Sequence, residues 1–335
     1  MWKLITDSYN IELNIPDDIA CSFNRIWEND IFDLDSYIKK LSVIDDHSVI
    51  ILWSADTRFN LNDRRVIKLN EFYHTIKNPM VIFTGVLNFI KPNFLDIHCQ
   101  GINLFQHVAK ISQPQNRSIV LEKSKKYLFM STKDYLSRRY ILQYLLNNGF
   151  EDQGIIAYKC LQKSFDEKFG KDVSYIKNAC ESINTQIPIV GFDGPLYNYD
   201  EVPEDIINDT YLSIITETYY QGPIYFSEKI YYAMLYNHFF IYLGPTYSLK
   251  YLRSLGFKTW GHIIDESYDD IEDPAERLYA VTNSINKFLS NPIDEIKQIY
   301  IENSDIINHN RNLVLSTELN DTIVSAMRSA IAAKS

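Results

Sequence analysis

The feature that most constrains the fold is an alternation between short β-rich runs and amphipathic helical patterns, which is clearest after residue 125. Strands separated by helices of this length predict a mostly parallel sheet with right-handed crossovers. The predicted strands here are Tyr127–Met130, Gly154–Tyr158, Ile187–Phe192, Tyr211–Ile215 and Phe239–Leu243, and the predicted helices are Leu136–Asn147, Asp166–Ser182, Ser227–Tyr236 and Ser248–Leu255.

The first third of the chain also shows an α/β pattern, with predicted strands at Ser48–Trp53, Met80–Thr84 and Arg117–Leu121 and helical patterns before and between them. The polar, turn-forming segment SQPQN at Ser112–Asn116 interrupts this pattern. We therefore expect a domain boundary after residue 115.

The tail from Asp273 onward has helical spacing and no convincing strand. Asp273 followed by Pro274 predicts an N-cap and a proline in the first helical position. The fold expected is α/β, with domains 1–115 and 116–272 facing each other across a cleft and a helical tail, 273–335, that braces them. The tail helices are predicted at Ala275–Leu289, Pro292–Glu302 and Leu319–Ala333.

Composition excludes several classes of protein. A formal net charge of -10 argues against a broad basic surface for nucleic acid, although a local basic cleft stays open. The four cysteines include no CxxC pair, so neither a zinc site nor a disulfide framework is expected. The chain lacks a signal peptide pattern and a stretch of membrane-spanning length, which predicts a cytoplasmic protein.

Known nucleotide and metal motifs are also missing. Neither GxGxxG nor GxxxxGK[ST] occurs, so a nucleotide would have to be bound in another way. The sequence DxD occurs only as Asp33-Leu34-Asp35, where helix capping is the better explanation, and we expect no bound metal. No obligatory protein partner is evident.

Three basic residues follow the predicted strand at Tyr127–Met130. Lys133 falls in the loop, and Arg138 and Arg139 fall in the next helix. Ligands of open α/β sheets bind outside the carboxyl ends of strands, and such cations suit a pyrophosphate. A solvated basic face is the alternative interpretation.

A second cluster opens the predicted helix at Ser227–Tyr236. Glu228 there can accept hydrogen bonds from ribose or sugar hydroxyls, and Lys229 can neutralise phosphate. Glu217, after the preceding strand, would enter the same cleft. Alternatively, Ser227 is the N-cap and Glu228 is favoured there by the helix dipole.

Two sequence blocks carry a resemblance to a known family: KYLFMSTKDYLSRRYILQYLLNNGFEDQGIIAY, and ITET…YFSEKIYYAML…FFIYLGP…LKYLRSLGFKTW. Residues 126–260 resemble the nucleotide-sugar-binding domain of GT-B-type glycosyltransferases, above all the fucosyltransferase-like and exostosin-like enzymes of bacteria, phages and large DNA viruses. Thr132-Lys133 replaces the Asn-Arg that this family tends to have, whereas Arg139 keeps its helical Arg.

The resemblance implies a fold of two Rossmann-like domains and a donor site that contains Glu228 and Lys229. It implies a nucleotide-diphosphate sugar as the donor substrate and no other cofactor. The N-terminal half would bind the acceptor.

An inverting transfer needs a base near the acceptor hydroxyl. Asp56 follows a predicted strand and is the first candidate, with a turn residue or N-cap as the alternative. His98 is the second candidate because an imidazole titrates near neutrality, although a lone His in a half-apolar segment is more often structural.

The function expected is therefore sugar transfer from a nucleotide-diphosphate sugar to an unidentified acceptor, either a glycan or polysaccharide or a modified base in phage DNA. The alternative is a non-catalytic module that binds a nucleotide or glycan on the same scaffold, because a fold does not fix a function.

Overall fold

The computed structural model describes residues 119–131, 135–158, 204–217, 224 and 226–316, together with six short strands nearer the N-terminus. The chain divides into two compact units, one formed by Met1–Ile111 with Ser316–Ser335 and the other by Ser112–Leu315. Of the predicted tail, residues 273–315 group with the second unit. The predicted elements Asp166–Ser182, Ile187–Phe192 and Leu319–Ala333 lie outside the described residues.

The first unit contains a parallel four-stranded sheet in the order β3-β4-β5-β6. Two of its strands, β4 (Val49–Trp53) and β5 (Met80–Phe83), confirm the sequence prediction. The pattern had not marked β3 (Phe23–Trp27) or β6 (Phe94–Asp96). A short antiparallel pair, β1 (Trp2–Lys3) and β2 (Asn14–Ile15), stands apart from this sheet.

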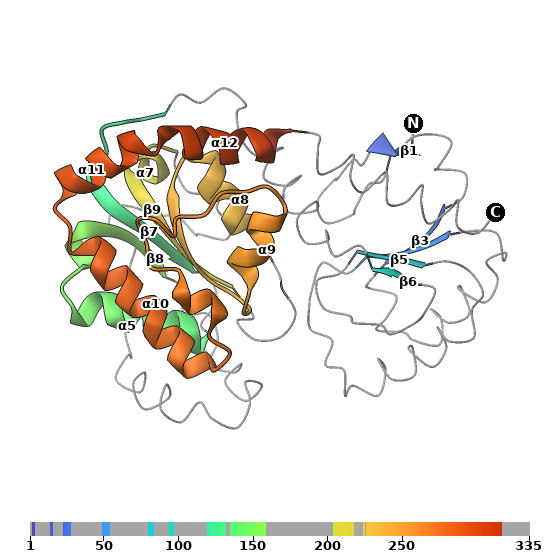
Figure 1. Ribbon diagram of the computed structural model, residues 1–335, viewed down its shortest axis with the longest axis horizontal. Coiled ribbons are helices and arrows are strands. Elements are labelled where there is room, and N and C mark those ends of the chain that lie inside the picture. Colours follow the sequence, from blue (N-terminus) through green and yellow to red (C-terminus); the bar gives the residue numbers. More distant parts are fainter. Residues whose placement is uncertain are drawn as a thin grey trace. The chain divides into compact units, whose positions relative to one another are not determined.

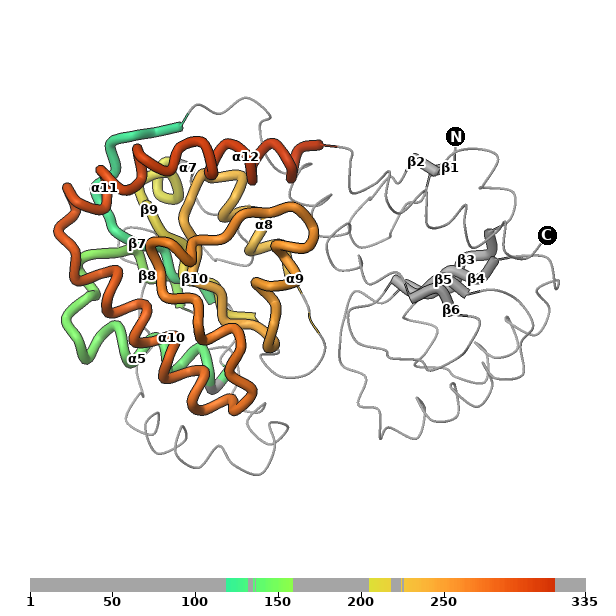
Figure 2. The backbone as a smooth tube through the Cα atoms, in the orientation of Figure 1, coloured from blue at the N-terminus to red at the C-terminus, as the bar shows by residue number. Residues whose placement is uncertain are grey.

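The second unit is built on four parallel strands in the order β10-β9-β7-β8, which confirms the α/β class (Figure 1). In Figure 2, β7 and β8 are green, β9 is yellow and β10 is orange. The four strands are β7 (Lys125–Ser131), β8 (Gly154–Tyr158), β9 (Thr210–Thr216) and β10 (Phe239–Leu243).

The strand order reverses between β7 and β9. From β7 the chain passes through α5 (Leu136–Asn147) outward to β8, and from β9 it passes through α8 (Glu228–Leu235) outward to β10 in the opposite direction. Because such crossovers are right-handed, α5 and α8 cover opposite faces of the sheet, as Figure 1 shows. The carboxyl ends of β7 and β9 therefore flank a topological switch point.

The remaining helices complete the two layers. Within the second unit, α10 packs on β10 and α5, α11 packs on β7 and β9, and α12 packs on α8. Their bounds, with those of the shorter elements, are α7 (Glu204–Asn208), α9 (Ser248–Ser254), α10 (Pro274–Leu289), α11 (Ile293–Glu302), α12 (Ser304–Leu315) and the 3-10 turns η2 (Glu151–Gln153) and η5 (Ser267–Asp270).

Aromatic side chains join the sheet to these helices. The Phe239 ring on β10 meets Trp260, Phe288 of α10 and Tyr300 of α11 edge-on, with ring centroids 4.7, 5.8 and 5.6 Å away. Every residue of β9 and of β10 is buried. These contacts make one continuous core of the sheet and the helices of the predicted tail. Edge-to-face ring packing stabilises this core in addition to the burial of apolar area.

One strand prediction is wrong. Residues 119–121, the described part of the predicted strand Arg117–Leu121, form no strand, and β7 begins only at Lys125. Val120 and Leu121 are exposed, and the carbonyl of Leu121 accepts a hydrogen bond from the Tyr211 hydroxyl at 3.0 Å instead of from a neighbouring strand. The apolar run is therefore a lead-in segment held by side chains.

Candidate functional site

Open α/β sheets bind ligands outside the carboxyl ends of their strands, at the switch point. In the second unit this place lies at the ends of β7 and β9. Several candidate residues from the sequence come together there. We call them, with their polar neighbours, the carboxyl edge: Ser131, Ser137, Arg138, Thr216, Glu217, Ser227, Glu228 and Lys229.

Arg138 joins the two strand ends. It lies in the first turn of α5 with 2% of its surface exposed, and its Nη2 donates a hydrogen bond of 3.1 Å to the carbonyl of Thr216, the last residue of β9. Its guanidinium also lies over the Tyr135 ring, 4.7 Å from the centroid. Burial lowers the pKa of Arg138, and the negative charge of Glu217 is the strongest influence in the other direction. Arg139, the next residue, is partly exposed.

Glu217 is fully buried directly after β9. Its Oε1 accepts hydrogen bonds from the backbone N–H and the hydroxyl of Ser227, at 3.0 and 2.7 Å, and from the hydroxyl of Tyr242 at 3.2 Å. A carboxylate held in this way organises the start of α8 from inside. The structure thus gives Glu217 an internal role, and contact with a ligand stays a prediction.

The Ser227-Glu228-Lys229 cluster combines helix capping with an ion pair network. Ser227 is the N-cap of α8, and its hydroxyl oxygen accepts from the Lys229 N–H at 3.4 Å, which confirms the capping interpretation. The Lys229 Nζ donates to the same oxygen at 3.0 Å and lies 3.5 Å from a Glu228 oxygen and 3.8 Å from Glu217 Oε2. Lys229 keeps 16% and Glu228 keeps 31% of its side-chain surface exposed, so both remain accessible to a ligand.

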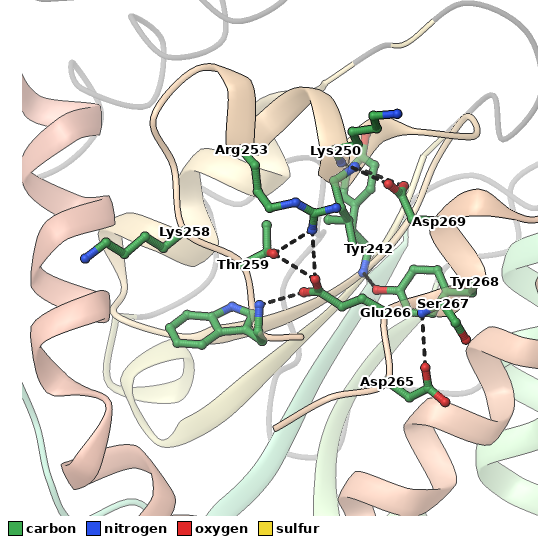
Figure 3. Close-up of polar contacts among 12 residues, drawn as sticks. Tyr242, Lys250, Arg253, Lys258, Thr259, Asp265, Glu266, Ser267, Tyr268 and Asp269 are labelled. Carbon is green, nitrogen blue, oxygen red and sulfur yellow. Dashed lines mark hydrogen bonds and ion pairs between the residues drawn. The ribbon is translucent and has the colours of Figure 1, made fainter. Parts of the chain in front are cut away.

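The sequence reasoning missed two buried acids in the connection after β10. The carboxylate of Asp269 accepts from the backbone N–H groups of Leu249 and Lys250 at 2.9 Å each, and so caps α9 (Figure 3). Glu266 accepts from Thr259, Trp260 and Arg253 at 2.7, 2.6 and 3.0 Å. Burial raises the pKa of both carboxyls. Sequence spacing carries no signal for either role, because both acids act on residues of another segment.

The opposite end of the sheet holds a cavity of about 560 Å³. It lies at the amino ends of β7 and β8 and beside α7, away from Arg138 and Lys229. Buried Lys123 lies near this amino edge, where its Nζ donates to the carbonyl of Thr210 at 2.8 Å. The cavity is lined by Val120, Glu122, Lys125, Ile155, Asp205, Ile206, Asn208 and Asp209.

Three predicted site residues, Asp56, His98 and Lys133, lie outside the described residues, as do Asp33 and Asp35. Within the described part of the chain, no group of three or more His, Cys, Asp or Glu residues is placed to hold a metal ion. No helix there is long and apolar enough to cross a lipid bilayer.

Comparisons with protein-family models, with curated proteins and with solved structures find no match to this chain. The function must therefore be argued from the chemistry of the carboxyl edge.

Proposed function

We propose that this chain is a glycosyltransferase whose 112–315 unit binds a nucleotide-diphosphate sugar at the carboxyl edge. The observation that carries the proposal is the buried guanidinium of Arg138, which connects the first turn of α5 to the end of β9 at the switch point. Cations at such a position stabilise the diphosphate that leaves during sugar transfer.

The other residues of the carboxyl edge and the neighbouring Arg139 divide the work in this proposal. Lys229 and Arg139, both partly exposed, neutralise phosphate charge, and the partly exposed Glu228 accepts hydrogen bonds from ribose or sugar hydroxyls. Glu217 keeps Ser227 and Lys229 in place. Lys133 is expected to join the phosphate contacts. The transfer needs no metal, since the positive side chains take over charge neutralisation.

In this proposal the whole chain has the GT-B architecture of two Rossmann-like domains, and the N-terminal one binds the acceptor. Asp56 or His98 there removes the proton of the acceptor hydroxyl as its oxygen attacks the anomeric carbon and the nucleoside diphosphate departs. The acceptor is a glycan, a polysaccharide or a modified base in phage DNA, and the reaction takes place in the cytoplasm.

A non-catalytic binding module is the second candidate, because the carboxyl edge holds the proposed binding groups whereas the proposed bases, Asp56 and His98, lie outside the described residues. Glu217 is fully buried and its Oε1 accepts three hydrogen bonds from the protein, which gives this carboxylate a structural role. The described carboxyl edge therefore supports ligand binding by itself, and transfer depends on residues elsewhere.

Thermal shift with UDP, GDP, ADP and CMP sugars tests the proposal. A ligand at one hundred times its Kd adds about 2.7 kcal/mol to the unfolding free energy, which raises the Tm of a unit of this size by several degrees. The stabilising sugar is then tested for hydrolysis and transfer. Glu228→Ala and Lys229→Ala should abolish both the shift and the turnover, whereas Lys287→Ala, an exposed lysine near the end of α10, should change neither.

The absence of any shift with all four classes of nucleotide sugar would refute the transferase. A shift without release of nucleotide or transfer of sugar would favour the binding module.

A further inference from the structure

The three helices that follow β7, β9 and β10 begin differently. The start of α8 contains the Ser227 cap and is held by the Glu217 carboxylate, and the start of α9 is capped by Asp269. The start of α5 has no side-chain cap and no acidic residue in its first turn. Because the N-terminal end of a helix attracts negative charge, the protein's own carboxylates already supply two of these ends, whereas no acidic residue lies in the described first turn of α5.

Two buried hydroxyls belong to Ser137 and to Thr216, the residue that the Arg138 side chain contacts. Ser137, in the first turn of α5, and Thr216, at the end of β9, are each 1% exposed. Neither hydroxyl has a hydrogen-bond partner within the part of the chain that the structure describes. Buried hydroxyls are normally hydrogen-bonded, so two such groups, one beside Arg138 in the chain and one on the residue that Arg138 contacts, indicate a ligand that supplies acceptor oxygens.

The positions of these hydroxyls suit one ligand. Side chains in the first turn of a helix lean toward its N-terminal end, which directs Ser137 to that end of α5. Thr216 lies at the guanidinium end of Arg138, because its carbonyl accepts the 3.1 Å bond from Arg138 Nη2. The Arg138 guanidinium has lost most of its hydration through burial, and an anion in contact with it would replace that hydration.

We propose that the N-terminal end of α5, with Ser137, Arg138 and Thr216, is a phosphate-binding site. The two hydroxyls donate to phosphate oxygens, the guanidinium supplies the positive charge, and the helix end adds its backbone N–H groups. The inference rests on the proposed function in one respect, since it assigns the donor's diphosphate to α5 and leaves α8, with Glu228, to the hydroxyl-bearing part of the donor.

Titration calorimetry of the full chain with inorganic pyrophosphate tests this site. Thr216→Val and Ser137→Ala each remove one hydroxyl with little change in volume, and each should weaken pyrophosphate binding about tenfold. Without ligand, both variants should melt at the wild-type temperature or above it, because no protein hydrogen bond is lost. The matched control is Thr282→Val in α10, whose buried hydroxyl donates to the carbonyl of Tyr279 at 2.8 Å. It should lower the melting temperature and leave pyrophosphate affinity unchanged.

The inference is overturned if the wild-type chain does not bind pyrophosphate, or if both hydroxyl variants bind it as tightly as the wild type. Parallel thermal shifts with nucleotide sugars separate this failure from that of the proposed function. If nucleotide sugars bind equally to all variants, the proposed transferase is supported and the α5 site is refuted. Pyrophosphate binding that depends on Ser137 and Thr216, with no response to any nucleotide sugar, leaves the phosphate site standing without the transferase.

Discussion

At the scale of single residues, burial separates ionisable side chains that hold the fold together from those that a ligand can reach. Glu217 has no exposed surface and accepts three hydrogen bonds. Glu228, the first residue of α8, keeps part of its side chain exposed. Both acids looked alike in the sequence. Their different surroundings predict different effects when each is removed.

Glu217→Ala should destabilise the protein by about 3 kcal/mol, since it leaves the buried N–H and hydroxyl of Ser227 without their acceptor. Glu228→Ala should cost less than about 0.5 kcal/mol, because its ion pair with Lys229 is partly exposed. Urea denaturation followed by tryptophan fluorescence measures both. Glu217→Gln, which keeps an acceptor oxygen, should recover part of the loss. Equal losses for the two alanine variants would show that Glu217 has no special structural role.

Lys123 is another buried charged residue, and it lies at the other end of the sheet. Its ammonium donates to the carbonyl of Thr210 and lies over the rings of Tyr300 and Tyr211, 5.1 and 5.7 Å from their centroids. Burial lowers the pKa of Lys123 to about 7, against an opposing influence from Asp209. Neighbouring His238 is also buried, and burial holds its pKa well below 6.5.

These shifts predict how stability depends on pH. Between pH 7 and 10.5 the unfolded chain binds a proton at Lys123 that the folded chain releases, so stability rises with pH by up to about 1.4 kcal/mol per unit. Lys123→Met should reduce this slope. Denaturation between pH 7.5 and 9.5 avoids His238, which acts only below pH 6.5, and Tyr300, whose raised pKa matters only above pH 10. Burial also lowers the pKa of Lys126, and this contribution is the same in both proteins. The same slope in both proteins would contradict the prediction.

At the scale of elements, helix ends determine how the connections are held. Asp273 caps α10 from within the same segment, with its Oδ1 accepting from the N–H groups of Ala275 and Glu276 at 2.9 and 2.8 Å. Asp269 instead caps α9 from a later turn of the chain, and so ties η5 to the helix that follows β10. A cap of the second kind stabilises tertiary as well as local structure.

Asp269→Ala should therefore cost about 2 kcal/mol, at the upper end of capping effects, because two N–H groups lose a buried acceptor. The exposed neighbour Asp270 serves as the matched control, and Asp270→Ala should change the unfolding free energy by less than about 0.5 kcal/mol. Chemical denaturation of both variants provides the comparison. A loss no larger than that of Asp270→Ala would mean that α9 does not depend on this cap.

At the scale of the whole molecule, helices α11 and α12 complete the core of the second unit. Tyr300 of α11 is fully buried, donates from its hydroxyl to the carbonyl of Asn237 at 2.8 Å, and meets the Tyr211 ring of β9 at 5.2 Å. The predicted tail is thus part of this unit as far as residue 315. Its proposed contact with the other unit stays a prediction.

A fragment of residues 112–315 should fold alone and unfold cooperatively in urea, because the parallel sheet is covered by helices of the same unit. A second fragment that ends at residue 289 lacks α11 and α12 and should lose cooperative unfolding, since Tyr211 and Phe239 lose the Tyr300 ring. Circular dichroism during denaturation compares the two. Cooperative unfolding of the shorter fragment would place α11 and α12 outside the core.

Local patterns in the sequence were sufficient to predict several helices and strands and some of their ends. The hydrophobic period predicted α5, β8 and β10 with the bounds observed, and Asp273-Pro274 predicted the start of α10, because these signals depend on near neighbours in the chain. The exposed run at Val120 and Leu121 misled the same reasoning, since an apolar run does not reveal whether a partner strand lies beside it.

The sequence by itself therefore determined the α/β class and the candidates Arg138, Glu217, Ser227, Glu228 and Lys229. Only the tertiary structure decided that Arg138 reaches Thr216, that Glu217 faces inward, and that carboxylates from other segments hold the starts of α8 and α9. The physical reason is that sheet order brings together residues far apart in the chain. The burial and the hydrogen-bond partners of each residue then depend on its neighbours in space and not on the spacing of residue types along the chain.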